Sequence, residues 1–399
     1  MDIFVARQPI FNLKKEIFGY ELLFRTGMSN AFPDIDGDTA TTSLLSSSFF
    51  TVGIDRISGG KISFVNFTED LLLKRYPEMF PAEKIMVEIL EDIEPTPDVI
   101  EACTALKENG YALALDDFVY DKRFDELIEL ADIIKVDFLL SPQDEIEQML
   151  KVLSKYKCKL LAEKIETYQE FELSKIMGFE YFQGYFFSKP EVLKNKEIPA
   201  NKFTILQLVS EVTKENLDID NLERLVNQDV SISYKLLNYL NSAYFNRIQP
   251  ISSLRQAIAF LGARGIRQFI SLVAIGQLTE GKPNELIRTS IIRARMLELI
   301  GTELKRDGGE LFMLGLFSLV DAMLDNTMEN LIPQMPLSDN ISEALISRTG
   351  KIFRFLRIIE SYELGLWEEF DKNIADLSIL PEKVVDFYLE AVGWADSWN

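Results

Sequence analysis

The first 190 residues alternate short β-branched or aromatic runs with helix-length segments, and this alternation limits the fold more than any other feature of the sequence. Runs of this composition favour strands, and their regular alternation with helices indicates consecutive βα units. Eight strands with intervening helices predict a closed (β/α)8 barrel of the TIM type rather than an open sheet. The expected strands are Phe4–Ile10, Ile17–Phe24, Ile62–Phe67, Ile85–Leu90, Ala112–Phe118, Ile133–Phe138, Leu160–Ile165 and Tyr181–Phe187.

Most segments between these strands are long enough for a helix, with one clear exception. Only Phe11–Glu16 separates the first two strands, whereas a parallel crossover needs about a dozen residues or more. The first two strands are therefore expected to form an antiparallel hairpin. Helices are expected at Pro97–Asn109, Asp125–Asp132, Asp144–Tyr156 and Tyr168–Met177.

The second half of the chain has a different pattern. Pro190 opens a short charged segment, and from Phe203 onward apolar residues recur at helical spacing. We therefore expect two domains, an α/β barrel over residues 1–195 and an all-α domain over residues 196–399. Gly262 is expected to end a helix. The expected helices are Asn221–Asn227, Ile232–Tyr239, Leu254–Leu261, Arg264–Gly276 and Leu286–Leu304.

The charge and the missing residue types exclude several classes of function. The formal charge of −21 disfavours DNA or RNA as a partner, because a phosphate backbone needs a basic surface. The chain contains no histidine, which excludes Ser-His triads, histidine metal sites and histidine proton shuttles. Cys103 and Cys158 are expected to be buried thiols rather than a disulfide. No run is apolar enough for a membrane span and the N-terminus lacks the order of a secretory signal, so the expected location is cytoplasmic.

Polar residues occur in or just after almost every expected strand, toward its C-terminal end. A lone acid in such a place is more often a surface or capping residue, but a set of them is harder to explain that way. In a (β/α)8 barrel these strand ends meet at the mouth, and Mg²⁺ and Mn²⁺ prefer carboxylate and amide oxygens. The sequence therefore predicts an oxygen-rich site for divalent cations. The residues are Glu21, Arg25, Asn66, Glu88, Asp116, Asp117, Lys135, Asp137, Glu163, Glu166 and Gln183.

Several short strings along these strands match a known family in that family's order. With Glu21-Leu22-Leu23 in the place of the motif that names it, the first 190 residues resemble the EAL-type cyclic di-GMP phosphodiesterases. Any one string is weak evidence, whereas the ordered set is specific. The other matching strings are Gln8–Ile10, Val65–Phe67, Glu88–Glu91, Leu115–Phe118, Lys135–Asp137, Ala162–Thr167 and Gln183–Pro190.

The resemblance implies a site that binds cyclic di-GMP and, when active, hydrolyses it to the linear dinucleotide pGpG with two divalent ions, Mg²⁺ or Mn²⁺. Lys135 and Glu163 match the pair that activates the attacking water, and Glu166 matches a residue that supports the lysine. Arg25 matches a contact to a substrate phosphate, and Gln183 matches a polar group close to the metals. The expected ligands of one ion are Glu21, Asn66, Glu88 and Asp116, and those of the second are Asp116 and Asp117.

Two departures from the family pattern bear on turnover. Val119–Arg123 stands where the family has a glycine-rich loop that ends in serines, and Lys164 stands where the family has glycine. In the family this loop orders the second metal ion and a dimer contact. The sequence therefore leaves open whether the barrel hydrolyses the nucleotide or only binds it, and whether the chain forms a homodimer.

The second half resembles the HDOD family over about residues 202–278. That family is related to the HD metal-dependent phosphohydrolases, but its members are generally non-catalytic output or interaction modules. An HD active site needs histidines for its metals, so the resemblance implies a non-catalytic domain that binds a protein partner. The matching strings are Asp229–Ser231, Leu236–Asn238, Asn241–Phe245, Ile251–Leu254 and Ala257–Gly262.

Together the two resemblances indicate a bacterial EAL–HDOD signalling protein, for which three functions are open. The barrel is an active phosphodiesterase, or a cyclic di-GMP sensor without turnover, or part of a scaffold that binds no nucleotide. The complete acidic set favours the first two, because barrel folding does not require acids at those positions.

Overall fold

The computed structural model describes residues 5–24, 54, 57–138, 142–189, 254–278, 282–335, 337–375, 377 and 379–396. The chain divides into two compact units, and each is described by itself. Unit 1 comprises Met1–Phe187 with Ser361–Glu368, and unit 2 comprises Ser188–Glu360 with Glu369–Asn399. The expected boundary between residues 195 and 196 lies outside the described residues and stays a prediction.

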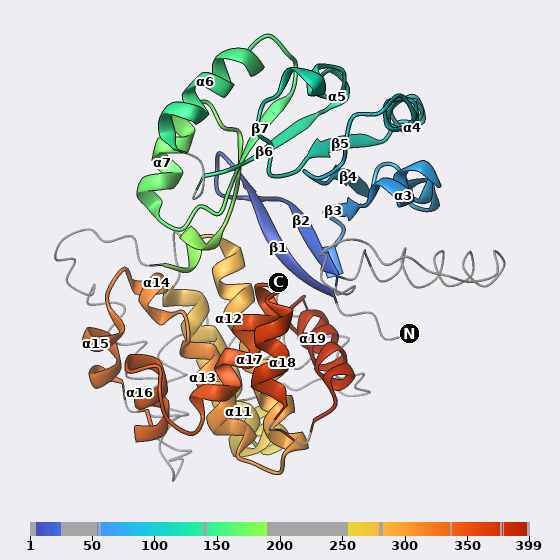
Figure 1. Cartoon of the computed structure of the whole chain (residues 1–399). Coiled ribbons are helices and arrows are strands. Elements are labelled where there is room, and N and C mark those ends of the chain that lie inside the picture. Colours follow the sequence, from blue (N-terminus) through green and yellow to red (C-terminus); the bar gives the residue numbers. More distant parts are fainter. Residues whose placement is uncertain are drawn as a thin grey trace. The chain divides into compact units, whose positions relative to one another are not determined.

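Unit 1 contains a closed barrel whose eight strands follow one another in chain order, which confirms the predicted fold (Figure 1). The first strand is antiparallel to both of its neighbours, the second and the eighth, and the predicted hairpin is thereby confirmed. The other neighbouring strands pair in parallel. The strands are β1 (Val5–Asn12), β2 (Ile17–Phe24), β3 (Ile62–Phe67), β4 (Ile85–Ile89), β5 (Ala112–Leu115), β6 (Ile133–Asp137), β7 (Lys159–Glu163) and β8 (Tyr181–Gln183).

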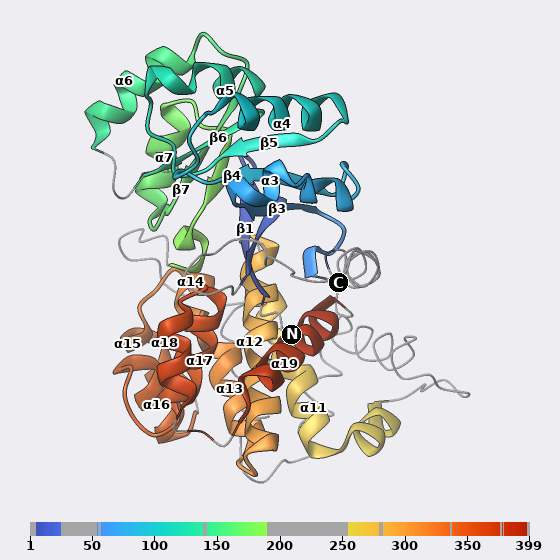
Figure 2. The same ribbon diagram turned by 45° about the vertical axis from the view of Figure 1, so that its right-hand side comes forward.

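Helices lie on the outside of this barrel (Figures 1 and 2). Local sequence sets where two of them begin. The Thr96 hydroxyl accepts from the N–H of Val99 to cap one helix, and Thr167 forms a capping box with Glu170 at the start of another. The helices are α3 (Glu69–Leu73), α4 (Pro97–Glu108), α5 (Asp125–Leu130), α6 (Gln143–Leu153) and α7 (Tyr168–Ile176), with short 3₁₀ turns η2 (Tyr76–Met79), η3 (Lys122–Phe124) and η4 (Tyr185–Ser188).

Five strands, β4 to β8, end earlier than the sequence predicted, and backbone conformation explains the two largest differences, in β5 and β8. β5 stops at Leu115 because the chain turns at Asp117, whose φ is +38°. β8 stops at Gln183 because Gly184 has a φ of +141°. A Cβ at Gly184 would lie 2.1 Å from the carbonyl oxygen of Ile165, so only glycine permits this close approach.

The interior of the barrel contains an apolar layer to which almost every strand contributes. β2 contributes the partly buried Phe18, which stacks on Tyr181 with ring centroids 4.2 Å apart, whereas a Cβ at Gly19 would lie 2.6 Å from Ile62 Cγ2. Side chains alternate between the two faces of a strand. The residue two positions after each member of this layer therefore also points into the barrel, one level closer to the C-terminal end of the strand. The layer comprises Ile10, Phe64, Met86, Ala114, Ile133, Leu161 and Tyr181.

Every described element of unit 2 is helical, in agreement with the predicted all-α domain. The first helix is broken at Gly262, where φ is 67° and ψ is 177°, at the predicted helix end. The predicted helices at Asn221–Asn227 and Ile232–Tyr239 lie outside the described residues. The helices are α11 (Leu254–Leu278), α12 (Asn284–Glu303), α13 (Gly308–Phe317), α14 (Val320–Leu324), α15 (Met328–Leu331), α16 (Asp339–Ile346), α17 (Phe353–Glu363), α18 (Trp367–Ile374) and α19 (Pro381–Asp396), with the 3₁₀ turn η6 (Ile332–Gln334).

Helix α12 packs against α13 and α19 in the middle of unit 2 (Figure 2). The approach to α13 depends on Gly315, because a Cβ there would lie 2.6 Å from the backbone of Arg293 and Ala294. Arg288 of α12 pairs with Asp396 of α19.

Two remaining expectations concern the thiols and the membrane. Cys103 and Cys158 are both free, as predicted, although Cys158 is only partly buried. In the part of the chain that the structure describes, no helix is both long enough and apolar enough to cross a membrane.

The carboxyl of Asp321, in the first turn of α14, yields a prediction about pH. Burial raises its pKa to about 6, although the N–H of Ala322 and the guanidinium groups of Arg293 and Arg348 favour the charged form. A raised folded-state pKa means that the folded protein binds the proton more tightly, so this carboxyl lowers stability as pH rises from about 4 to about 6. Asp321→Asn should remove a penalty of up to roughly 3 kcal/mol at neutral pH.

The measurement is urea unfolding followed by tryptophan fluorescence, because all three tryptophans lie after residue 360. The gain in stability from Asp321→Asn should widen between about pH 4 and about pH 6 and stay constant above about pH 7. Asp386→Asn, at an exposed position of α19, is the matched control. A gain from Asp321→Asn that stays constant with pH would contradict the prediction.

Candidate functional site

A ring of polar side chains lies next to the apolar layer, at the C-terminal ends of the parallel strands. Asn66 and Glu88 are direct neighbours across β3 and β4, and Asp137 is the neighbour of Glu163 across β6 and β7. The period of two in each strand places each of these residues on the inner face. The structure therefore brings together, at one end of the barrel, these members of the set predicted from sequence: Glu21, Asn66, Glu88, Asp116, Lys135, Glu163 and Gln183.

The ammonium of Lys135 stands at the centre of this ring. Its side chain is fully buried, and four carboxylates of the described residues surround it. Because a buried charge without a partner is very unfavourable, this lysine and the acids need each other in the folded state. The distances from Lys135 Nζ are 2.6 Å to Asp116 Oδ1, 2.8 Å to Glu88 Oε1, 2.9 Å to Glu163 Oε1 and 3.5 Å to Glu21 Oε2.

The electrostatics of the ring raise the pKa values of three of its groups. Burial lowers the pKa of Lys135, but the surrounding carboxylates, led by Asp116 and Glu163, outweigh it and hold the pKa well above its usual value. Burial raises the pKa of Glu88 well above its usual value, against the attraction of Lys135. The pKa of Glu163 is raised in the same way. One ammonium therefore does not neutralise the ring, which favours the binding of further positive charge.

Two amide side chains hold Glu21 in place. Asn66 Nδ2 donates to Glu21 Oε1 at 3.1 Å, and Gln183 Nε2 donates to Glu21 Oε2 at 2.5 Å. Gln183 Nε2 also donates to Gln8 Oε1 at 3.0 Å. Since the amide nitrogens face Glu21, the amide oxygens are left for other partners.

The unpaired oxygens of the ring fit a divalent cation. Within the described residues, five buried oxygens of four groups at the mouth accept no hydrogen bond, although Glu88 Oε1 forms an ion pair with Lys135 Nζ at 2.8 Å. Buried oxygens usually have a partner, and carboxylate and amide oxygens are the donors that Mg²⁺ and Mn²⁺ prefer. The atoms are Asn66 Oδ1, Glu88 Oε1, Glu88 Oε2, Glu163 Oε2 and Gln183 Oε1.

The spacing of the acids is at present set by Lys135. Among the described residues, no three acidic or cysteine side chains form a ready-made metal centre. The carboxylates instead gather around the ammonium, which lies within 3.0 Å of Glu88, Asp116 and Glu163. The carboxylate and amide oxygens are therefore of the types that bind a divalent ion. In this structure, however, the carboxylates are positioned around the ammonium of Lys135.

A second acidic cluster lies beside the ring and includes a residue that the sequence analysis did not place among the metal ligands. Lys164 Nζ pairs with Asp137 Oδ2 and lies 3.3 Å from Asp117 Oδ2. Partial burial opposes this charge, but the hydrogen bond from Lys164 to Asp137 and the charge of Asp117 raise the pKa of Lys164 to about 12. The sequence analysis named Asp137 among the polar strand residues without a role, and it lies two residues after Lys135 on the same face of β6.

Besides Asp117, which lies in the second cluster, two predicted site residues do not join the ring in the described structure. Arg25 lies outside the described residues. Glu166 is exposed at the start of α7, where its N–H donates to Glu170 Oε2 at 2.8 Å, and it is not one of the described carboxylates around Lys135. The roles expected for Arg25 and Glu166 stay predictions.

Side chains hold the loop after Asp117 in the absence of the glycines typical of the family. Asp121 Oδ1 accepts from the N–H of Arg123 at 3.0 Å, and the guanidinium of Arg123 pairs with both oxygens of Glu94 at 2.7 and 2.9 Å. The Tyr120 hydroxyl donates to Asp125 Oδ1 at 3.2 Å. The sequence analysis missed the partnership of Arg123 with Glu94, because these residues lie far apart along the chain.

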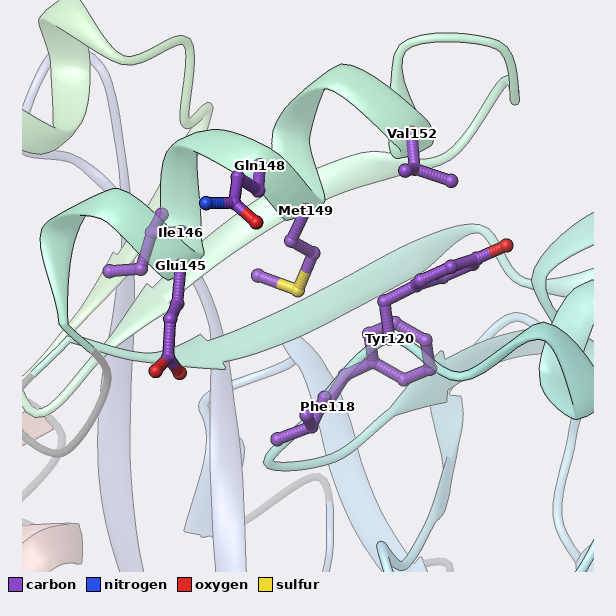
Figure 3. Close-up of a pocket in the computed structure, with 8 residues that line it drawn as sticks. Phe118, Tyr120, Glu145, Ile146, Gln148, Met149 and Val152 are labelled. Carbon is purple, nitrogen blue, oxygen red and sulfur yellow. The ribbon is translucent and has the colours of Figure 1, made fainter.

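Pockets lie on both sides of this loop. One is lined by residues of the loop and of α6, and Figure 3 shows Met149 of α6 pointing toward the loop that carries Phe118 and Tyr120. The other is lined by Asp116 and Asp117 together with the loop, and it therefore borders the candidate site.

The fold and the site together define a class of protein. A (β/α)8 barrel with an antiparallel first strand, and with one lysine among acids and amides at its mouth, is the arrangement expected of an EAL barrel. The EAL domain model matches residues 51–190, and the HDOD domain model matches residues 198–335. The chain belongs to the family of EAL–HDOD proteins.

Curated relatives extend over nearly the whole chain. It is 37% identical over 401 residues to the cyclic di-GMP phosphodiesterase CdgJ of Vibrio cholerae, covering 99% of this chain and 93% of that protein. It is 36% identical to YuxH of Bacillus subtilis, covering 99% of this chain and 98% of that protein.

Solved structures with EAL domains are also similar. A standalone EAL protein from Vibrio cholerae O395, in its c-di-GMP-bound form, is 27% identical with a TM-score of 0.37, covering 47% of this chain and 92% of that one. The Bacillus subtilis YkuI protein, in complex with c-di-GMP and calcium, is 19% identical with a TM-score of 0.36, covering 58% of this chain and 73% of that one.

The unpaired oxygens of Glu88 predict opposite effects on stability and on metal binding. Glu88→Gln removes a buried charge and should raise the free energy of unfolding by roughly 1 to 3 kcal/mol in the presence of a chelator. The same change removes a carboxylate donor and should weaken Mn²⁺ binding at least tenfold, by the order of magnitude of one charged ligand.

Urea unfolding with EDTA and calorimetric titration with Mn²⁺ measure the two effects. Glu101→Gln, on the exposed side of α4, is the control and should change neither quantity. A variant that loses stability without metal and binds Mn²⁺ as the parent does would exclude Glu88 as a ligand.

Proposed function

We propose that this protein is a metal-dependent cyclic di-GMP phosphodiesterase, which opens the cyclic dinucleotide to linear pGpG. The observation that carries the proposal is the convergence of Glu21, Glu88, Asp116 and Glu163 around Lys135 at the mouth of an EAL barrel. The similarity to CdgJ along the whole chain supports the same activity.

In the proposed reaction a first divalent ion, Mg²⁺ or Mn²⁺, would be held by carboxylate and amide oxygens at the mouth, of which those of Asn66 and Glu88 accept no hydrogen bond. A bound divalent ion supplies an acidified water and stabilises charge on phosphate oxygens. By resemblance, Asp116 and Asp117 would hold a second ion, and in this structure the ammonium of Lys164 lies 3.3 Å from Asp117 Oδ2. The residues proposed for the first ion are Glu21, Asn66, Glu88 and Asp116.

Glu163 and Lys135 carry the proton transfer in this proposal. The carboxylate of Glu163 accepts the proton of the water as the water oxygen bonds to phosphorus. The ester bond from phosphorus to the 3′-oxygen breaks, and that oxygen leaves with the proton that Glu163 took from the water, which returns Glu163 to its carboxylate form. Lys135 Nζ lies 2.9 Å from Glu163 Oε1, so it orients the base and stabilises the charge that develops next to it.

For the second half of the chain we propose a non-catalytic HDOD domain that binds a protein partner. The family match and the complete lack of histidine in the sequence support this assignment. Cyclic di-GMP in the barrel would then regulate, or be regulated by, that partner.

A second candidate function is a cyclic di-GMP sensor that binds without turnover. The loop Val119–Arg123 favours it, because its conformation rests on Asp121 and on the pair of Arg123 with Glu94 rather than on glycines. This arrangement differs from the loop that orders the second metal ion in the family.

One experiment separates these functions. Cyclic di-GMP binding is measured by calorimetry in Ca²⁺, and product is measured by chromatography in Mg²⁺ and in Mn²⁺. The proposed enzyme produces pGpG, whereas a sensor binds the nucleotide and produces none. A chain that neither binds nor hydrolyses the nucleotide would be a scaffold and would overturn the proposal.

Variants of the site sharpen this test. Glu163→Gln should keep nucleotide binding and lower kcat by about 10² to 10⁴, because it removes the proton acceptor but no expected metal ligand. Glu21→Ala and Asp116→Ala should abolish metal-dependent binding and turnover while the fold is kept. Glu172→Gln, on the exposed side of α7, is the control. Parent-like turnover in Glu163→Gln would show that the base lies elsewhere.

A further inference from the structure

The Lys164 side chain occupies the middle of an acidic pair at the rim of the site. Its ammonium pairs with Asp137 at the end of β6 and with Asp117 after β5. Asp117 is the residue that resemblance assigns to the second metal ion. One fixed positive charge therefore already lies where a second divalent ion is expected.

The backbone at both ends of this contact is unfavourable for the residues that stand there. Lys164 has a φ of +54° and Asp117 has a φ of +38°, in the region that glycine adopts most readily. Neighbouring hydrogen bonds maintain the turn at Lys164, because the N–H of Ile165 donates to the carbonyl oxygen of Gln183 and its own carbonyl oxygen accepts from Phe186, both at 3.0 Å. Strained conformations that persist in this way often lie at functional sites.

Stability alone does not account for the arrangement. The Lys164 side chain is 43% exposed and that of Asp117 is 36% exposed. Ion pairs with this exposure contribute little to folding, and a lysine at a left-handed position is less favourable than glycine. The contact is better explained by an effect on the charge of the site.

We propose that the ammonium of Lys164 substitutes for the second divalent ion, so that the barrel binds one metal ion instead of two. This inference rests on the proposed function and specifies its metal requirement. The tethered ammonium neutralises Asp117 and Asp137 but cannot acidify a water, so activation of the nucleophile is left to the first ion with Glu163 and Lys135.

Metal stoichiometry tests the proposal without reference to turnover. Mn²⁺ binding to the full chain is measured by calorimetry, and free Mn²⁺ is counted by electron paramagnetic resonance. The parent should bind one Mn²⁺ per chain, and Lys164→Gly should bind two. Glycine suits the positive φ, so this variant is expected to fold. Lys164→Arg keeps the positive charge and should again bind one.

Each other result overturns the inference. A parent that binds two ions, or a Lys164→Gly variant that binds one, shows that the ammonium does not replace an ion. A Lys164→Arg variant that binds two shows that the positive charge is not what excludes the ion. Cyclic di-GMP binding in Ca²⁺ is measured in parallel. If the nucleotide still binds, these results contradict only the role of Lys164 and not the proposed function. If the parent binds neither metal nor nucleotide, the proposed function is contradicted as well.

Discussion

Lys135 carries a positive charge into the closed interior of a barrel, where water cannot solvate it. Such a charge is tolerated only if opposite charges reach it, and here they come from β2, β4, β7 and the end of β5. These elements must therefore meet at one point with their carboxylates inward. The same requirement fixes which end of the barrel is polar, so the electrostatic need of one lysine determines both the packing at the mouth and the place of the site.

The alternation of strand side chains explains why fold and site could be predicted together. A strand that places Met86 in the apolar layer must place Glu88 at the mouth, and the same holds for Leu161 and Glu163. The pattern of the sequence therefore indicated the strands and the inward acids together, and the short segment Phe11–Glu16 indicated the first hairpin. Strands β2, at Ile17–Phe24, and β3, at Ile62–Phe67, were predicted to the residue.

The features that the sequence did not indicate depend on contacts across the fold or on single torsion angles. The early ends of β5 and β8 follow from the φ values of Asp117 and Gly184, which no periodicity encodes. The pairing of Arg123 with Glu94 joins two separate loops. Asp137 was visible as a polar strand residue, but its partnership with Lys164 requires the turn after β7. Local patterns predict which residues face inward, whereas the partners of rim residues are set by tertiary structure.

The two lysines of the mouth differ in a way that links stability to function. A site rich in unpaired carboxylates destabilises the fold until a cation binds, and any ion that binds only the folded state then stabilises it. Lys135 is fully buried and supplies part of that compensation permanently. Lys164 is 43% exposed, so its ammonium lies at the rim with access to water. A chain that neutralises these acids with its own lysines depends less on metal for its folding. The same lysines, however, occupy acids that must be free to bind metal for metal-assisted chemistry. The balance between these two demands, rather than the presence of the acids alone, determines how much catalysis such a barrel retains.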